Sequence, residues 1–242
     1  MEMKTTKDTL ARTGLVVLNE FIVEESGHSF FRCATRIDDD WVPTYSRFIP
    51  RKEFITEDNR FSPPGIEWLY LAWADNPENA QRCATAECRI KSGDRFALCE
   101  FSAVNKKAQI FDLTIADHHT YDSINNIVSD FIYSTAEKSA SIFCKTGKMI
   151  AKNELENFTL EMSRLSLVFI YLKMLSSQLF VPIENNKKNM YAPFHCFACY
   201  LRTLGYDGIA YSSTVSDEGK NLVLFNKTDA KPVGPITTGI CK

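Results

Sequence analysis

Three short segments of the chain contain the residue types that could do chemistry. Arg32 lies inside the apolar run HSFFRCAT (28–35), Glu87 ends the stretch Thr85-Ala86-Glu87, and Ser213 ends GYDGIAYSS (205–213). A guanidinium can hold a phosphate group through two parallel hydrogen bonds, and a carboxylate can stabilise a positive charge that develops during a reaction. Ser213 is not expected to be a covalent nucleophile, because neither a base nor a Gly-x-Ser-x-Gly elbow accompanies it.

Taken singly, each of these residues has a plainer explanation. An arginine in a strand usually forms a salt bridge, a glutamate on a helix usually faces solvent, and a serine at a strand end usually serves a turn. Their order along the chain gives them weight. The segment RFSPPGIEWLYLAW (60–73) lies between the first two, and the run NLVLF (221–225) follows the third.

Together and in this order, the segments resemble the RES-domain family, which is named for an Arg, a Glu and a Ser. The resemblance touches most of residues 28–113 and 190–226. It implies an α+β, ADP-ribosyltransferase-like fold in which a split β-sheet core forms a cleft for nicotinamide adenine dinucleotide (NAD). Known members are the toxin halves of bacterial toxin–antitoxin pairs.

The family resemblance also implies an activity. Its members deplete NAD by hydrolysis or phosphorolysis, and some transfer ADP-ribose to a protein. We therefore expect a cytoplasmic enzyme that cleaves the nicotinamide–ribose bond of NAD, that needs no metal and that has a protein antitoxin as partner. A mono-ADP-ribosyltransferase acting on a protein and a non-catalytic binding module are the alternatives, and a homodimer stays open.

The resemblance assigns roles to numbered residues. Glu87 would stabilise the ribosyl cation, Arg32 would hold the pyrophosphate, and Ser213 would position Glu87 or contact the ribose. These three form the expected catalytic set. The expected NAD-binding residues are Arg60, Gly65, Tyr70, Tyr211 and Ser212.

The chain departs from the family pattern at three places. Phe31 stands where many relatives have Tyr, which removes a hydroxyl. Ser62 precedes Pro63 where the family commonly has Asn, and His195 stands where larger relatives often carry Gln. We expect the change at His195 to act, if at all, on contacts at the edge of the cleft.

Composition excludes several classes of protein. The formal charge is −2, from 28 basic and 30 acidic side chains, so no basic excess favours nucleic-acid binding. The most apolar late segment, 165–172, is too short to cross a membrane, and the N-terminus has no apolar signal core. We expect neither nucleic acid nor a membrane as partner.

Eight cysteines are spread irregularly along the chain. Cys196 and Cys199 beside His195 have ligand-like spacing, and Cys83 and Cys88 form a second close pair. Because the spacing of Cys83 and Cys88 is not that of a standard zinc knuckle, we favour buried, reduced thiols over zinc. The sequence Asp117-His118-His119 is interpreted as a loop.

The elements that must position these residues form strands at both ends and helices in the centre. Strands are predicted at 28–35, 68–73, 95–101, 108–113, 209–212 and 221–225, and helices at 76–88, around 124–132, at 155–180 and at 192–204. The caps are predicted at Asp75 or Asn76 for the first helix, at Asp122 or Ser123 for the second, and at Gly205 for the end of the last.

We interpret 1–242 as a single RES domain with a polar tail (1–12), a loop (38–64) and a helical insertion (114–185). The insertion could be a lid, a dimer surface or an inhibitor-docking element. Its apolar faces are expected to pack on the core.

Overall fold

The computed structural model describes residues 15–17, 29–36, 43–114, 121–147, 152–179 and 188–241. The chain divides into two compact units, which are treated separately below. One comprises 15–113 and 181–242, and the other comprises 1–14 and 114–180. The predicted polar tail (1–12) and the Asp117-His118-His119 loop lie outside the described residues.

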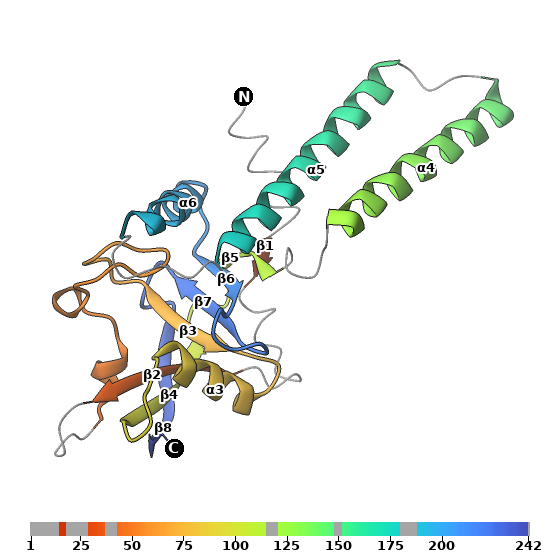
Figure 1. Ribbon diagram of the computed structural model, residues 1–242. Coiled ribbons are helices and arrows are strands. Elements are labelled where there is room, and N and C mark those ends of the chain that lie inside the picture. Colours follow the sequence, from red (N-terminus) through yellow and green to blue (C-terminus); the bar gives the residue numbers. More distant parts are fainter. Residues whose placement is uncertain are drawn as a thin grey trace. The chain divides into compact units, whose positions relative to one another are not determined.

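The first unit, the sheet unit, contains eight strands in the order β1-β5-β6-β7-β3-β2-β4-β8 (Figure 1). Their bounds are Leu15–Val17 (β1), Phe30–Arg36 (β2), Leu69–Trp73 (β3), Arg95–Ala103 (β4), Gln109–Asp112 (β5), Gly208–Ser212 (β6), Lys220–Leu224 (β7) and Ala230–Ile240 (β8). Among the described residues of the same unit are the α-helices α3 (Pro77–Glu87) and α6 (Ala192–Thr203). The α+β prediction is confirmed.

The sheet is almost divided between β2 and β3. These two strands share one paired position, Phe31 with Ala72, whereas β2 pairs with β4 along its whole length and β3 with β7 along its whole length. One half of the sheet is therefore β1-β5-β6-β7-β3 and the other is β2-β4-β8. A joint this short lets the two halves turn away from each other and leaves strand edges open beside it.

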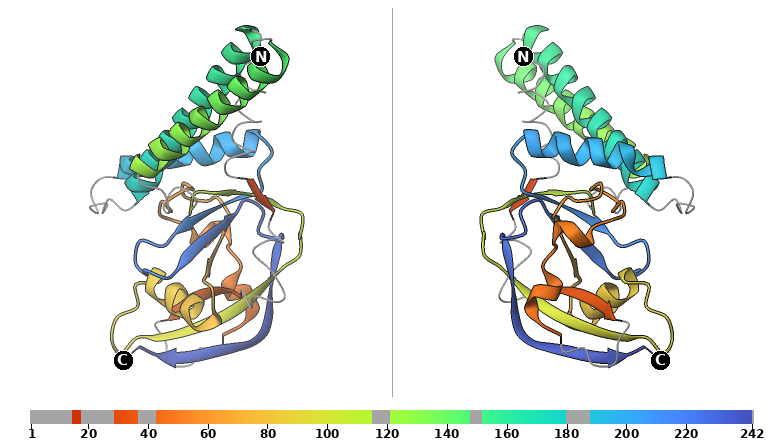
Figure 2. Two further views of the ribbon diagram at one scale, coloured as in Figure 1. Left: turned by 90° about the vertical axis from the view of Figure 1, so that its right-hand side faces the viewer. Right: turned by 90° about the vertical axis from the view of Figure 1, so that its left-hand side faces the viewer.

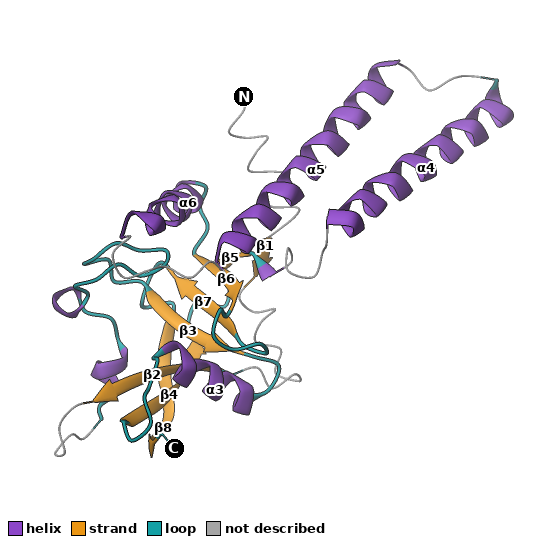
Figure 3. Ribbon diagram, viewed as in Figure 1, coloured by secondary structure: helices purple, strands orange, loops and turns teal. Residues whose placement is uncertain are grey.

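Local sequence explains why α3 begins and ends where it does. Asn76 is its N-cap and accepts a hydrogen bond of 2.8 Å from the backbone N–H of Asn79, and Pro77 occupies the first turn. Asn76 is thus the cap, rather than Asp75. The helix stops after Glu87, and Arg89 adopts a positive φ of 49°. Its small buried residues pack on β2, β3 and β4 (Figure 3): Ala80, Cys83 and Ala84 against Phe31, Cys33, Ala72 and Leu98.

Aromatic side chains hold α6 in the sheet unit. Phe197 packs edge-on against Phe111 of β5, with ring centres 5.7 Å apart. The helix ends in a Schellman motif: the N–H of Gly205 bonds to the carbonyl of Arg202, and that of Tyr206 to the carbonyl of Leu201. Gly205 has a φ of +89°, so the predicted C-terminal cap is confirmed.

The second unit, the helix unit, contains α4 (Tyr121–Thr146) and α5 (Lys152–Leu179), which run beside each other in both views of Figure 2. Since α4 begins at Tyr121, Asp122 lies in its first turn, and the predicted cap at Asp122 or Ser123 is wrong. A carboxylate in the first turn still complements the helix dipole. The apolar side chains of Ile124, Ile127 and Val128 were expected to pack on the core. The structure describes their backbone but not their side chains, so this stays a prediction. Along the described residues, no helix has the length and apolarity needed to cross a membrane.

Two parts of the sheet unit differ from the prediction. The run NLVLF is not the last strand, because β8 follows it and pairs with β4 at the edge of the sheet. Pro232, Gly234, Pro235 and Gly239 are typical of turns, but an edge strand tolerates them because one side of it needs no ladder hydrogen bonds. The predicted loop at 38–64 contains two short 3-10 helices, Tyr45–Phe48 and Lys52–Phe54.

Candidate functional site

A cavity of about 250 Å³ opens in the sheet unit at the joint between the two halves of the sheet. Consecutive residues of β2 (31–33) and of β3 (70–72) line it. The remaining lining residues come from α3 and its end (Ala84, Glu87, Cys88), from β6 (Tyr211), from β7 (Asn221) and from the loop before β3 (Asn59).

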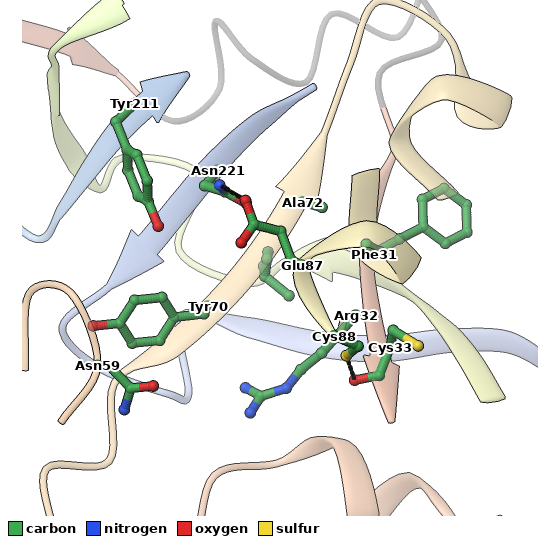
Figure 4. Close-up of a pocket in the computed structure, with 12 residues that line it drawn as sticks. Phe31, Arg32, Cys33, Asn59, Tyr70, Ala72, Glu87, Cys88, Tyr211 and Asn221 are labelled. Atoms are coloured by element: carbon green, nitrogen blue, oxygen red, sulfur yellow. Dashed lines mark hydrogen bonds between the residues drawn. The ribbon is translucent and has the colours of Figure 1, made fainter. Parts of the chain in front are cut away.

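A row of paired positions crosses the sheet beneath the cavity. Tyr211 of β6 pairs with Asn221 of β7, Asn221 with Ala72 of β3, and Ala72 with Phe31 of β2. Residues directly opposite each other in antiparallel strands lie on the same face. Tyr211 and Asn221 project toward the cavity beside the small Ala72, whereas the ring of Phe31 points away from them (Figure 4) and packs with Ala80 and Ala84 of α3.

The carboxylate cluster, which we define as Glu87, Ser213 and Asn221, forms one wall of the site. The Ser213 hydroxyl donates to Glu87 Oε1 at 2.8 Å, and the Asn221 amide Nδ2 donates to the same oxygen at 2.5 Å. Among the described residues, Glu87 Oε2 accepts no hydrogen bond, and it faces the open space of the cavity (Figure 4). Two donors thus hold one oxygen of the carboxylate and leave the other for a ligand.

The position of Glu87 is unfavourable for the helix that carries it. Glu87 is the last residue of α3, where the helix dipole is negative and a carboxylate costs about 0.3–1 kcal/mol. The hydrogen bonds from Ser213 and Asn221 offset that cost. A carboxylate placed against the local preference of its helix and supported by distant residues is typical of a functional site.

The loop after β6 brings Ser213 to Glu87. Ser213 is 5% exposed, its N–H bonds to the carbonyl of Gly219, and its Oγ accepts from the N–H of Val215 at 3.2 Å. Gly219 lies against Cys83 of α3 so closely that any side chain there would collide with the thiol. A glycine at 219 is therefore needed for this loop to approach α3.

The guanidinium side, which we define as Arg32, Cys33 and Cys88, forms the opposite wall. Arg32 Nη1 is buried and has no hydrogen-bond partner among the described residues. Burial is the main cause that lowers the pKa of Arg32 to about 10, so the group still carries its charge at neutral pH. A buried N–H without a partner costs about 1–3 kcal/mol, more when charged, and this favours an anionic group in the cavity.

Two tyrosines complete the cavity, and the loop at 60–62 supports both. Ser62 Oγ and the Tyr70 hydroxyl are hydrogen-bonded at 2.9 Å, and burial raises the pKa of Tyr70 to about 12. Phe61 packs edge-on against Tyr211, with ring centres 5.1 Å apart, and burial raises the pKa of Tyr211 as well. Both phenols therefore stay neutral near neutral pH.

The structure brings together most of the residues that the sequence singled out, but not all of them. Arg32, Glu87, Tyr70 and Tyr211 line the cavity, and Ser213 contacts it through Glu87. Three expected NAD-binding residues, Arg60, Gly65 and Ser212, are not among the lining residues.

The environments of these three residues differ. Arg60 donates to the Thr214 hydroxyl at 3.2 Å and so ties the 60–62 loop to the Ser213 loop. Gly65 has a φ of +78°, and its N–H bonds to the carbonyl of Ile55, as expected of a turn glycine. Their roles in NAD binding, like that of Ser212, stay predictions.

Sequence reasoning missed Asn221, although a signal was present. Asn221 begins the otherwise apolar run NLVLF, and a buried polar residue inside a strand needs a partner. Here it is 5% exposed and its partner is Glu87. Asn59, Cys33 and Cys88 also line the cavity and were not expected to.

The three residues that depart from the family pattern lie in or next to the cavity wall. Phe31 is buried beside the cavity, and Ser62 supplies the partner of the Tyr70 hydroxyl. His195 Nε2 hydrogen-bonds the backbone carbonyl of Asn59 at 2.9 Å, so His195 contacts the edge of the cavity through the backbone.

All eight cysteines are free thiols. Cys144, Cys196 and Cys199 are exposed, so the expectation of buried thiols is wrong for these three, whereas Cys33, Cys83 and Cys99 are buried. Within the part of the chain that the structure describes, no three His, Cys, Asp or Glu side chains gather as a metal site would require.

No protein-family model and no curated protein matches the chain. Among solved structures, it is similar to a chain of the crystal structure of the M. tuberculosis MbcT–MbcA toxin–antitoxin complex, with a TM-score of 0.40 and 7% sequence identity. The similarity covers 97% of this chain and 92% of that chain. A similarity this low does not assign the chain to a family.

Proposed function

We propose that the chain is an NAD-consuming enzyme that cleaves the nicotinamide–ribose bond, with water or phosphate as acceptor. The observation that supports this most is that one cavity contains both a negatively charged carboxylate and a positively charged guanidinium. The carboxylate of Glu87 is held by two donors on one oxygen, and Nη1 of the buried Arg32 has no hydrogen-bond partner in the part of the chain that the structure describes. NAD presents a cationic nicotinamide–ribose end next to an anionic pyrophosphate, so it offers each wall the charge that it lacks.

The size of the cavity suits one end of the dinucleotide. Its volume of about 250 Å³ lies below the roughly 300–1,000 Å³ that is usual for a drug-sized ligand. The nicotinamide and its ribose would occupy the cavity, with Tyr70 and Tyr211 beside the ring. The near phosphate would then meet Arg32, and the adenosine part would lie outside.

Glu87 would act on the bond that breaks. As the C–N bond between ribose and nicotinamide lengthens, the electron pair leaves with the nicotinamide and positive charge develops on the anomeric carbon. The free Oε2 of Glu87 would stabilise that charge and hold the 2′-hydroxyl. Water then adds to the cation and loses a proton, which yields ADP-ribose, nicotinamide and H⁺. Phosphate in place of water yields ADP-ribose 1″-phosphate.

Ser213 and Asn221 would be positioning residues in this reaction. Both bind Oε1, so they fix the rotation of the carboxylate and direct Oε2 to the cavity. Preorganised charge of this kind needs no rearrangement when the cation forms, which is the source of its effect on the rate.

The direct test is release of nicotinamide from NAD by the purified chain, with and without phosphate. Glu87→Gln, which keeps the shape of the side chain, is the variant, and Glu78→Gln on the first turn of the same helix is the matched control. Release by the unmodified chain and by Glu78→Gln, with none by Glu87→Gln, is the expected result. Equal release by Glu87→Gln, or none by the unmodified chain in either buffer, would overturn the proposal.

The acceptor is settled by the products. Free ADP-ribose or its phosphate identifies the hydrolytic or phosphorolytic reaction. If radiolabel from the adenine part of NAD appears on a cell protein instead, the chain is a mono-ADP-ribosyltransferase.

The resemblance to toxin families adds a cellular expectation, namely a toxin with a protein antitoxin encoded beside it. Expression of the unmodified chain should stop growth and lower the NAD content of the cell, and Glu87→Gln should do neither. Co-expression of a neighbouring gene product should restore growth. Normal growth with unchanged NAD under strong expression would contradict the toxin role.

A further inference from the structure

Two cysteine thiols lie together in the wall of the cavity, on the side away from Ser213 and Asn221. Cys33 belongs to β2 and Cys88 caps the end of α3, so they are 55 positions apart in sequence. Cys88 Sγ lies 3.4 Å from the backbone carbonyl oxygen of Cys33, within the range of a weak S–H donor (Figure 4). Each of the two thiols also shifts the pKa of the other.

The surroundings make the two thiols unequal. The hydrogen bond from Cys33 is the main cause that lowers the pKa of Cys88, and the positive charge of Arg32 acts in the same direction against the effect of burial. The same hydrogen bond, together with burial, raises the pKa of Cys33. Cys88 is thus the thiol that ionises first, while Cys33 keeps its proton, which is the arrangement of an attacking and a resolving thiol.

Two other buried cysteines of the sheet unit, Cys83 and Cys99, differ from this pair. Burial raises the pKa of Cys83 to about 11 and that of Cys99 to about 11, so both stay protonated near neutral pH. Cys144, Cys196 and Cys199 are exposed and serve as internal references for simple accessibility.

Arg32 indicates which reagents the site would take. Its buried Nη1 has no partner among the described residues, and it lines the same cavity as both thiols. An anion that enters the cavity can therefore bind the guanidinium while it stands next to Cys88. Of the low-molecular-weight disulfides, those that carry carboxylates fit this pairing.

We propose that Cys88 and Cys33 form a covalent modification site for anionic low-molecular-weight disulfides, which Arg32 recruits. The Cys88 thiolate attacks one sulfur of the disulfide R–S–S–R, forms the mixed disulfide Cys88–S–S–R and releases RS⁻. Cys33 then gives up its proton and attacks the Cys88 sulfur, so that a Cys33–Cys88 disulfide forms and a second RS⁻ leaves. In total two protein thiols are oxidised and one R–S–S–R is reduced to two thiols.

Modification at this site has a consequence for the cavity. Cys88 is the residue after Glu87, and the adduct on it occupies the space beside Arg32. The site would therefore couple the oxidation state of the surroundings to access to the cavity. It does not depend on the proposed function, because the thiol chemistry is measured without NAD.

The experiment follows the eight thiols of the full chain by mass spectrometry of its peptides. The reduced protein is treated near neutral pH with dithiobis(nitrobenzoate), an anionic disulfide, or with cystamine, a cationic one. Cys88 should react before Cys144, Cys196 and Cys199. It should also react at least about tenfold faster with the anionic reagent than with the cationic one, because one nearby positive charge favours an anion by about a factor of ten. The Cys33–Cys88 disulfide peptide should follow.

Two variants test recruitment of the reagent and formation of the protein disulfide separately, and a third is the control. Arg32→Met should slow the reaction of Cys88 by about tenfold and remove the preference for the anionic reagent. Cys33→Ser should stop the reaction at the mixed disulfide. Cys144→Ser, on α4, is the control and should leave the fast reaction unchanged.

The proposal is overturned if the exposed cysteines react before Cys88, or if no Cys33–Cys88 disulfide forms. A folded Arg32→Met variant that keeps the preference for the anionic reagent would remove the role of Arg32. These outcomes are independent of nicotinamide release, so failure of this site and failure of the NAD reaction are distinguishable.

Discussion

The two walls of the cavity differ in the hydrogen-bond partners that the protein supplies to their charged groups. In the carboxylate cluster, Glu87 is exposed enough to meet a ligand, yet two protein donors already hold one of its oxygens. On the guanidinium side, Arg32 is charged and buried, and its Nη1 has no partner among the described residues. The protein thus holds one oxygen of Glu87 in place without a ligand, whereas among the described residues it supplies no partner to Nη1 of Arg32.

Because of this difference, the two walls should contribute to different stages of the reaction, one to the chemical step and the other to binding. A group that is preorganised and fully supported should act on the rate of the chemical step. A buried charge that lacks its partner should act on binding, because the ligand relieves a cost already present in the free protein. Substitutions on the two walls should therefore give different kinetic signatures.

The largest expected effect is that of Glu87→Gln. Removing the negative charge while keeping the side-chain shape should lower kcat for nicotinamide release by about a thousandfold or more, with little change in KM. Steady-state kinetics with NAD measure both constants. A rise in KM with unchanged kcat would mean that Glu87 binds the substrate rather than stabilising the cation.

Arg32→Met should show the opposite pattern. Loss of charge-assisted hydrogen bonds to the phosphate should raise KM for NAD by about 100-fold. The same change should raise the Tm of the ligand-free protein, because it removes a buried charge that has no described partner. Thermal unfolding with and without NAD checks this, with the exposed Arg82→Met as control. A lower Tm in the free protein would show that Arg32 is satisfied without a ligand.

The supports of the carboxylate should have a smaller effect. Asn221→Ala and Ser213→Ala should each lower kcat by about tenfold, since each removes one hydrogen bond to a charged oxygen. In the double variant, kcat should fall by less than the product of the two single decreases, because both donors hold the same oxygen, Oε1 of Glu87. Independent, multiplicative losses would argue against a shared positioning role.

The smallest expected effect concerns stability at alkaline pH. The pKa of Tyr70 is raised from its ordinary 10 to about 12, chiefly by burial. The neutral phenol therefore contributes stability that is complete below pH 10 and is lost as the pH rises through 12. The loss is at most about 3 kcal/mol.

Tyr70→Phe tests this contribution by denaturant unfolding between pH 9 and pH 12. The variant lacks the phenol, so its stability should fall less steeply over this interval than that of the unmodified chain. Tyr133→Phe, at an exposed tyrosine of α4, is the control. Parallel curves for Tyr70→Phe and the unmodified chain would show that the Tyr70 phenol titrates as it does in solution.

Much of the sheet unit was predictable from local pattern. The strands around 28–35, 68–73 and 95–101 and the helices at 76–88 and 192–204 follow from alternating or periodic apolar residues, caps and a C-terminal glycine, which act over a few positions. The edge strand β8 was missed because its prolines and glycines are typical of turns. The cap of α4 was misplaced for a similar reason, since Asp122 suits a cap and a first turn equally well.

The printed sequence contains the residue types that the site needs. An arginine in an apolar strand, a glutamate near the end of a predicted helix and a serine after a strand are visible in it, and their order supports the resemblance. How these residues meet depends on the tertiary structure. The single paired position between β2 and β3 opens the cavity, Asn221 joins Ser213 on Glu87, and Cys88 comes to Cys33 beside an Arg32 that lacks a partner among the described residues. The physical reason is that such contacts join residues tens to more than a hundred positions apart, whereas the patterns that predict helices and strands extend over a few residues.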